Sequence, residues 1–170
     1  MTAVRSDLGP SASLADAHRE HYRSLVKLAS LLIDDRGTCE EIVQDAFVAV
    51  FRSVDRLRDD TKLAPYLRSA VLNGARSHLR KRAVRSRLRV VGSDDTQSAE
   101  ASAVLADDQR AVIEALRRLP DRQRDVLVLR FYLDLSESEI AATLGIGGGT
   151  VKTHVRRGLE SLARELESRR

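Results

Sequence analysis

Tryptophan is absent from this sequence, and aromatic residues of any kind make up only 4% of its 170 residues. β-Sheets draw heavily on aromatic and β-branched side chains, whereas Leu and Ala suit helices. The overall content of hydrophobic residues is nevertheless ordinary, at 42%. The composition therefore favours helical packing built from Leu, Val and Ala over a β-sandwich.

Cysteine is almost absent as well. Cys39 stands alone, so it can form no internal disulfide and has no second thiol with which to hold a metal ion. A single unpaired thiol suits a reducing cytosol, and we expect this one to be inert. No metal site and no cofactor are predicted.

Long apolar runs are missing too. No stretch approaches the roughly 20 apolar residues that a helix needs to span a bilayer. Residues 1–13 lack the apolar segment of a signal peptide. We expect a soluble, cytoplasmic protein that does not insert into membranes.

The common catalytic motifs are also lacking. The sequence has no G-x-x-x-x-G-K-[ST] loop, no H-E-x-x-H pair, and no plausible Ser/His/Asp or Cys/His set. The run Gly147-Gly148-Gly149 follows a predicted helix rather than a strand, which disfavours a nucleotide-binding loop. At the start of a helix these glycines would instead let backbone N–H groups approach a phosphate closely. We predict that the chain is not an enzyme.

The most distinctive stretch of the sequence is 136–157, and its pattern predicts two short helices around a sharp turn. Ser136 and Glu139 have the spacing of a capping box, in which two side chains satisfy free N–H groups at a helix start. Gly145 can take the left-handed conformation that ends the first helix. The pattern is typical of a helix-turn-helix, a common DNA-binding unit.

The second helix of this motif combines an apolar stripe with basic residues on its other faces. The stripe consists of Val151, Val155, Leu159, Leu162 and Leu166. An ordinary helical hairpin with solvated charges is the alternative interpretation of this stretch taken alone.

Two helices are predicted near the start of the chain, over residues 14–33 and, after a turn at 34–37, from Thr38 onward. Thr38 and Glu41 fit a second capping box. The helix after Thr38 has two neighbouring apolar stripes, one of Ile42, Ala46 and Val50 and one of Val43, Phe47, Phe51 and Val54. One stripe can receive a partner helix while the other serves the core, or the chain itself can bury both.

A third, long helix is predicted from Leu63 into the late 80s, with Pro65 suited to its first turn. Its second half is strongly basic, and no acid occurs from Arg76 to Val91. A solvated face would normally mix both signs, so an unmixed basic run indicates contact with phosphates. Tyr66 offers a ring on which an unpaired base can stack.

The composition changes abruptly at residue 92, where a Ser/Ala/Asp-rich stretch without any base begins. Such a stretch has too few apolar residues to pack, which predicts a flexible acidic linker. Two further helices, 104–119 and 121–133, are separated by Pro120, and the second is expected to supply Val126, Leu127, Leu129 and Phe131 to the core. We predict an all-α chain made of a disordered tail (1–12), a helical domain (13–91), the linker (92–106) and a second helical domain with the helix-turn-helix (107–170).

Two stretches resemble the second and fourth conserved regions of bacterial RNA polymerase sigma factors, specifically of the extracytoplasmic-function (ECF) group. The first is CEEIVQDAFVAVFRS followed by PYLRSAVLNGARSHLRKR. The second is LPDRQRDVLVLRFYLDLSESEIAATLGIGGGTVKTHVRRGLESL. Their order and the acidic linker between them match that group. The family commonly has Trp where Tyr66 stands and Ser where Gly147 stands.

The resemblance implies a factor that binds core RNA polymerase and then recognises and melts promoter DNA. The implied contacts with the clamp of the largest polymerase subunit are Glu41, Gln44, Asp45 and Phe47. Those with the minus-ten element are Arg58, Lys62, Tyr66, Asn73, Arg76 and Arg80. Those with the minus-thirty-five element are Thr150, Lys152, Thr153, His154, Arg156 and Arg157. The flap of the second-largest subunit is a further implied partner, and many members of the group are held by an anti-sigma factor.

Two other classes of protein compete with this interpretation. The segment TVKTHV also resembles the output domain of LuxR-type transcription regulators, which bind DNA without binding core polymerase. Such regulators usually carry a receiver or ligand domain with strands, whereas residues 14–90 show only helical periodicity. An adaptor acting through protein contacts alone is disfavoured by the arginine run and by the basic recognition helix.

Overall fold

The computed structural model describes residues 10–52, 62–88 and 107–168. Within these ranges the chain is helical and contains no strand, which confirms the predicted all-α class. The helices are α1 (Pro10–Leu32), α2 (Arg36–Arg52), α3 (Leu63–Leu88), α4 (Asp107–Arg118), α5 (Asp121–Leu127), α6 (Glu137–Leu144) and α7 (Gly148–Glu167), with a π-helical turn, η3 (Val128–Tyr132), directly after α5. The predicted linker at 92–106 and residues 1–9 of the predicted tail lie outside the described ranges.

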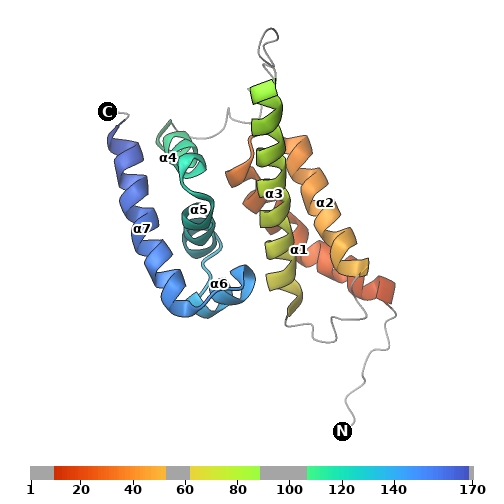
Figure 1. The fold of residues 1–170 in the computed structure, drawn as a ribbon. Helices are drawn as coiled ribbons and strands as arrows, with labels where there is room; N and C mark the ends of the chain where they lie inside the picture. Colours follow the sequence, from red (N-terminus) through yellow and green to blue (C-terminus); the bar gives the residue numbers. More distant parts are fainter. Residues whose placement is uncertain (1–9, 53–61, 89–106, 169–170) are drawn as a thin grey trace.

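The helices form two groups, α1 to α3 and α4 to α7, and α3 lies between them (Figure 1). On one side α3 packs against α1 and α2, and on the other it packs against α6. A second contact joins α1 to α4. The buried side chains form one continuous cluster that runs through both groups. The two predicted helical domains are therefore packed against each other.

The start of α2 differs from the prediction. The carboxylate of Asp35 accepts a hydrogen bond from the backbone N–H of Thr38 at 2.7 Å, so Asp35 caps the helix and Thr38 lies inside it. The hydrogen bonds from Thr38 lower the pKa of Asp35 below its usual value. The predicted capping box of Thr38 and Glu41 is wrong, because an equally good cap residue stands one turn earlier. Helix α1 likewise begins earlier than predicted, at Pro10, a residue suited to the first helical position.

Helix α2 is buried on two sides. Residues of both predicted apolar stripes, among them Ile42, Val43 and Phe47, are covered by α1 and α3. Gly74 in α3 makes the approach of these helices possible, since a Cβ atom at that position would lie 2.8 Å from Cγ2 of Ile42. Of the two interpretations left open by the sequence, the structure supports burial of both stripes within the chain over residues 42–51, whereas Val54 lies outside the described residues.

The helix predicted over 121–133 changes its winding in the middle. After α5 the chain makes a π-helical turn, in which the N–H of Leu133 donates to the carbonyl of Val128 at 3.2 Å. A π-helical turn contains more residues than an α-helical turn, so side chains beyond Val128 are rotated relative to α5. Phe131 is therefore 64% exposed, and its predicted place in the core is wrong.

The helix-turn-helix consists of α6 and α7. The capping box at Ser136 and Glu139 is present as predicted, and Gly145 has a left-handed φ of 64°. The apolar stripe of α7 differs in one place, because Gly158 occupies the contact position against α5 and Leu159 is 44% exposed. A Cβ atom on Gly158 would lie 3.0 Å from Cγ of Leu127, so the glycine lets α5 and α7 approach closely.

A pair of glycine substitutions tests this close packing. We expect Gly74→Ala to lower the free energy of unfolding, because overpacking costs about 1–3 kcal/mol and outweighs a helix-propensity gain of about 1 kcal/mol. Gly149→Ala is the matched control, since no atom lies within 4 Å of a Cβ built there and it should stabilise the protein. Urea unfolding measures the free energy of unfolding of both variants, and equal changes in the two would contradict the close contact at Gly74.

Candidate nucleic-acid and polymerase interface

The residues predicted to read the minus-thirty-five element lie on the first turns of α7. The side chains of Thr150, Lys152, Thr153, Arg156 and Arg157 are all exposed. His154 differs from them. It is half-buried, and its Nδ1 is inaccessible to solvent and has no hydrogen-bond partner among the described residues. The exposed members face solvent, whereas the imidazole of His154 is turned partly into the protein.

The charges on this surface are paired only weakly. Nζ of Lys152 lies 3.7 Å from a carboxylate oxygen of Glu137 in α6, and Arg156 pairs with Glu160 one turn along α7 at 2.9 Å. All four side chains are well exposed, and such pairs contribute only about 0.2–1 kcal/mol. Phosphate oxygens can therefore replace these carboxylates at little cost.

The three glycines before and within the start of α7 are not required by the packing of the chain. Among the described residues, no atom beyond the adjoining backbone lies within 4 Å of a Cβ built on Gly147, Gly148 or Gly149, and Gly147 has an ordinary negative φ of −74°. Gly147 occupies the N-cap position but has no side chain with which to cap the helix. The start of α7 is consequently open, and no other element in the described part of the chain packs against these glycines.

The residues predicted to read the minus-ten element lie along α3 and just before it. Lys62, Tyr66, Asn73 and Arg80 are exposed, and the ring of Tyr66 is 48% accessible. The rest of the arginine run, Lys81, Arg82, Arg85 and Arg87, is exposed as well. Arg58 lies outside the described residues. The exposed members form a basic face with an aromatic ring near one end.

Arg76 is the exception on α3, because it is bound inside the protein. Its Nε and Nη2 atoms donate to Oδ2 of Asp125 at 3.0 and 2.5 Å, and its Nη1 donates to the side-chain oxygen of Asn73 at 3.1 Å. The side chain of Asp125, in α5, is completely buried, and that of Arg76 is 14% exposed. Burial raises the pKa of Asp125, and the positive charge of Arg76 opposes that shift.

The residues predicted to bind core polymerase lie on α2 but do not form one surface. Glu41, Gln44 and Asp45 are exposed. Phe47 is only 4% exposed, and the centre of its ring lies 5.0 Å from that of His18 in α1. Because α1 covers it, Phe47 does not share the exposed face of Glu41, Gln44 and Asp45, and its contact with polymerase stays a prediction.

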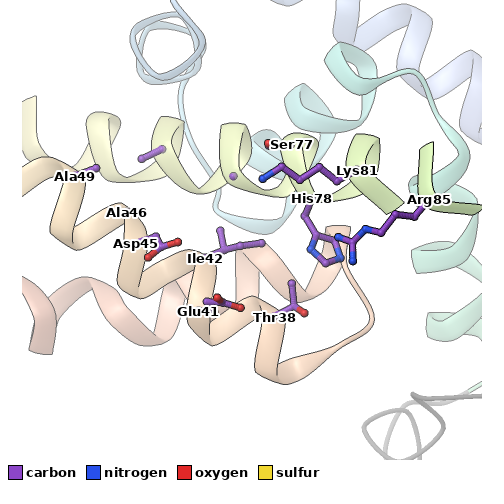
Figure 2. Close-up of a pocket in the computed structure, with 12 residues that line it drawn as sticks. Thr38, Glu41, Ile42, Asp45, Ala46, Ala49, Ser77, His78, Lys81 and Arg85 are labelled. Carbon is purple, nitrogen blue, oxygen red and sulfur yellow. The ribbon is translucent and has the colours of Figure 1, made fainter. Parts of the chain in front are cut away.

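A groove runs between α2 and α3, and we call it the α2–α3 groove (Figure 2). Its floor contains small residues, including Ala46, Ala49, Ala70 and Gly74. Glu41 and Asp45 lie on the α2 side, whereas His78, Lys81 and Arg85 lie on the α3 side (Figure 2). The groove therefore has an acidic wall and a basic wall above a narrow apolar floor.

The structure shows an exposed apolar patch that the sequence patterns did not predict. Phe131 and Tyr132, on the π-helical turn, are 64% and 43% exposed. Burial raises the pKa of the Tyr132 phenol, which is thus partly shielded from water. Because α-helical periodicity assigns Phe131 to the core, only the local change to π-helical winding brings the two rings to the surface.

The described residues contain no group of three or more His, Cys, Asp or Glu side chains arranged to hold a metal ion. None of the helices in the described ranges has the length and apolar character needed to cross a membrane.

Comparison with known proteins identifies two family matches, one in each helical group. The family described as sigma-70 region 2 matches residues 17–85, and the family described as sigma-70, region 4 matches residues 109–162. The chain is 30% identical to the RNA polymerase sigma-E factor of Streptomyces avermitilis, over 89% of this chain and 83% of that protein. It is 26% identical to the ECF RNA polymerase sigma factor SigW of Bacillus subtilis, over 95% and 91% of the two chains.

A solved structure has a similar fold. The sigma factor RpoE from Bartonella quintana, determined in complex with the anti-sigma factor NepR, matches with a TM-score of 0.72 and 22% sequence identity. The match covers 93% of this chain and 99% of that one. The fold of this chain is thus also found in another protein.

A prediction about α2 follows from the burial of Phe47. We expect Phe47→Ala to lower the free energy of unfolding by about 3–5 kcal/mol, because it empties a filled site in the core. Gln44→Ala, on the exposed side of the same helix, should change it by no more than about 0.5 kcal/mol. Chemical denaturation followed by circular dichroism distinguishes the two variants, and a stable Phe47→Ala protein would contradict the assignment to the core.

Proposed function

The chain belongs to the sigma-70 family of RNA polymerase sigma factors, within its ECF group, and from this premise we propose a division of work between its two helical groups. As a sigma factor it directs transcription initiation from promoters. In the proposal, α1 to α3 dock on core polymerase and read the minus-ten element as it melts. Helices α4 to α7 read the minus-thirty-five element.

The proposed domain limits are those expected from the sequence, 13–91 and 107–170 joined by the linker 92–106. The two family matches support them, because they fall on either side of the acidic stretch. A LuxR-type regulator is not favoured, since a sigma-70 region occupies the place where a receiver or ligand domain would be. We further propose that the protein acts by binding alone, without enzymatic activity, in the cytoplasm where the polymerase works.

The observation that best supports the division is the presence of two exposed basic surfaces on different helices. On α7, Lys152, Thr153 and Arg156 lie on the early turns of a helix-turn-helix, where recognition helices meet base edges and phosphates. On α3, the basic face adjoins Tyr66. Stacking of an unpaired base on such a ring is worth about 1–3 kcal/mol, and this favours a melted strand over a duplex.

For core polymerase we propose two contacts. The polar face of α2 with the α2–α3 groove suits the clamp of the largest subunit, because a helix carrying charges of both signs would find complementary walls there. The exposed pair Phe131 and Tyr132 suits the flap of the second-largest subunit, since exposed aromatic residues are common anchors in protein interfaces.

An anti-sigma factor is a further proposed partner. The structurally similar RpoE of Bartonella quintana was determined in complex with its anti-sigma factor NepR. The same fold in this chain supports binding of a protein of that kind.

Binding to core polymerase provides the primary test. We expect the purified chain to bind core enzyme in a pull-down and to start transcription from a cognate promoter. Gln44→Ala combined with Asp45→Ala should weaken core binding by about tenfold, the effect of losing roughly 1.4 kcal/mol of interface energy. Glu167→Ala removes an exposed acid at the far end of α7 and is the control. Failure of the wild-type chain to bind core would refute the proposal.

DNA reading by α7 predicts a change in salt dependence. Lys152→Ala with Arg156→Ala should reduce the slope of log K against log[salt] for a minus-thirty-five duplex by about two, roughly one for each lost phosphate contact. The fold should survive, because both side chains are more than 60% exposed, at 69% and 67%. Arg164→Ala, farther along α7, serves as the control. Fluorescence anisotropy at several salt concentrations measures the slope, and an unchanged slope would count against the assignment.

A further inference from the structure

We propose that Gly149 and Thr153 form the part of α7 that meets base edges, and that Thr153 recognises the C5-methyl group of a thymine in the minus-thirty-five element. The inference rests on the proposed reading of that element by α7, and it names the feature of a base that one residue reads. It is carried by the position of Thr153 on the helix, the hydrogen bond of its hydroxyl and the missing side chain at Gly149.

Thr153 lies in the middle of the outward face of α7. Val151 is completely buried, and Gly158 is buried against α5. Since successive residues are about 100° apart around an α-helix, Thr153 lies about 200° from Val151, almost opposite the buried side. Thr153 itself is exposed. A recognition helix presents the face away from its own core to the floor of the major groove, so Thr153 is central to that contact.

Longer basic side chains flank this central position. Lys152 and Arg156 lie on one side of it and Arg157 on the other, and all three are exposed. At about 100° per residue, they are about 40–100° from Thr153 around the helix. Long cationic side chains placed in this way reach phosphates along both edges of a groove, which centres the short side chain of Thr153 over the bases.

Gly149 lies one helical turn before Thr153 on the same face. It is exposed, and among the described residues no side chain or neighbouring element lies within 4 Å of a Cβ built on it. A glycine destabilises a helix relative to alanine, and the packing of the chain does not require one here. A glycine does allow the backbone to approach another molecule closely. The missing side chain therefore brings α7 near enough to the bases for Thr153 to touch them.

The hydroxyl of Thr153 is already engaged within the helix. Its Oγ1 donates a hydrogen bond to the backbone carbonyl of Gly149 at 3.0 Å. Donation to an acceptor on a base would break this bond, whereas the methyl group is free to make an apolar contact. Threonine methyl groups make such contacts with the C5-methyl group of thymine. The oxygen can still accept a hydrogen bond from an amino group of adenine or cytosine, and two variants of Thr153 distinguish these contacts.

Uracil substitution in the promoter tests the methyl contact. The full chain bound to core polymerase, the holoenzyme, first selects its minus-thirty-five sequence from a promoter library randomised in that element. Each thymine of the selected element, on either strand, is then replaced singly by uracil, which lacks only the C5-methyl group. We expect wild-type holoenzyme to lose about fourfold in promoter affinity at one of these thymines, the effect of one buried methyl-sized group. Competition binding of promoter fragments measures the loss.

Two variants assign the effect to Thr153. Thr153→Ser keeps the hydroxyl but lacks the methyl group, so it should bind the thymine promoter about fourfold more weakly than wild type. It should lose nothing more when that thymine becomes uracil, because the two changes remove the same contact. Thr153→Val keeps a methyl group and lacks the hydroxyl, so it should discriminate thymine from uracil as wild type does. Circular dichroism checks that both variants fold.

Gly149→Ala tests the close approach of α7 to the bases. The substitution should stabilise the free chain, because alanine favours the helix. It should nevertheless weaken promoter binding by about fivefold or more, because a methyl group added at a close contact holds the surfaces apart. The opposite signs exclude damage to the fold as the cause. Arg164→Ala, an exposed position farther along α7, is the control and should leave promoter binding unchanged.

Several results would overturn the inference. They are a selected element in which uracil is tolerated at every thymine, a Thr153→Ser holoenzyme that keeps the wild-type sensitivity to uracil, and a Thr153→Val holoenzyme that loses it. Wild-type promoter binding by Gly149→Ala would overturn the close approach. A chain that forms no holoenzyme, or a holoenzyme that enriches no minus-thirty-five sequence, refutes the proposed function and this inference together. An enriched element that tolerates uracil refutes the inference alone.

Discussion

Helix α3 packs against other helices on two sides, and the rest of the structure depends on these two sets of contacts. Its apolar side chains Leu67, Val71, Leu72 and Ala75 are all completely buried. Helices α1 and α2 cover one side of it and α6 packs on another, which leaves a remaining face for the basic residues. A helix packed in this way cannot change its neighbours gradually, because close-packed surfaces either fit or separate.

The ion pairs of the chain differ in strength according to their exposure, and that difference bears on DNA binding. Lys152 and Arg156 on α7 pair with carboxylates in water, so exchanging them for phosphates costs little. Arg76 on α3 is paired with a fully buried carboxylate, and its exchange would leave that charge without a partner. In the described structure the basic side chains of α7 can therefore exchange their partners at little cost, whereas the exchange of Arg76 is costly.

Several local features were predictable because they depend on residues close in sequence. The capping box of Ser136 and Glu139 and the left-handed Gly145 were recognised correctly, since each involves backbone groups within one helical turn. The capping prediction failed at the start of α2, because Asp35 and Thr38 are both good cap residues and Asp35 provides the cap. The periodicity prediction failed at Phe131, because it assumes constant helical winding and the π-helical turn interrupts that winding.

The sequence by itself determined the helical class, the helix-turn-helix and the basic character of α3, which follow from composition, periodicity and short motifs. Its resemblance to the ECF sigma factors indicated the family that the comparisons show. Only the tertiary structure decided which side of α2 faces outward, that Phe47 is covered by α1, and that Arg76 binds Asp125. The physical reason is that burial and ion pairing depend on which surfaces meet in space. Arg76 and Asp125 are 49 positions apart, and no periodic pattern along the chain specifies that two such residues will meet.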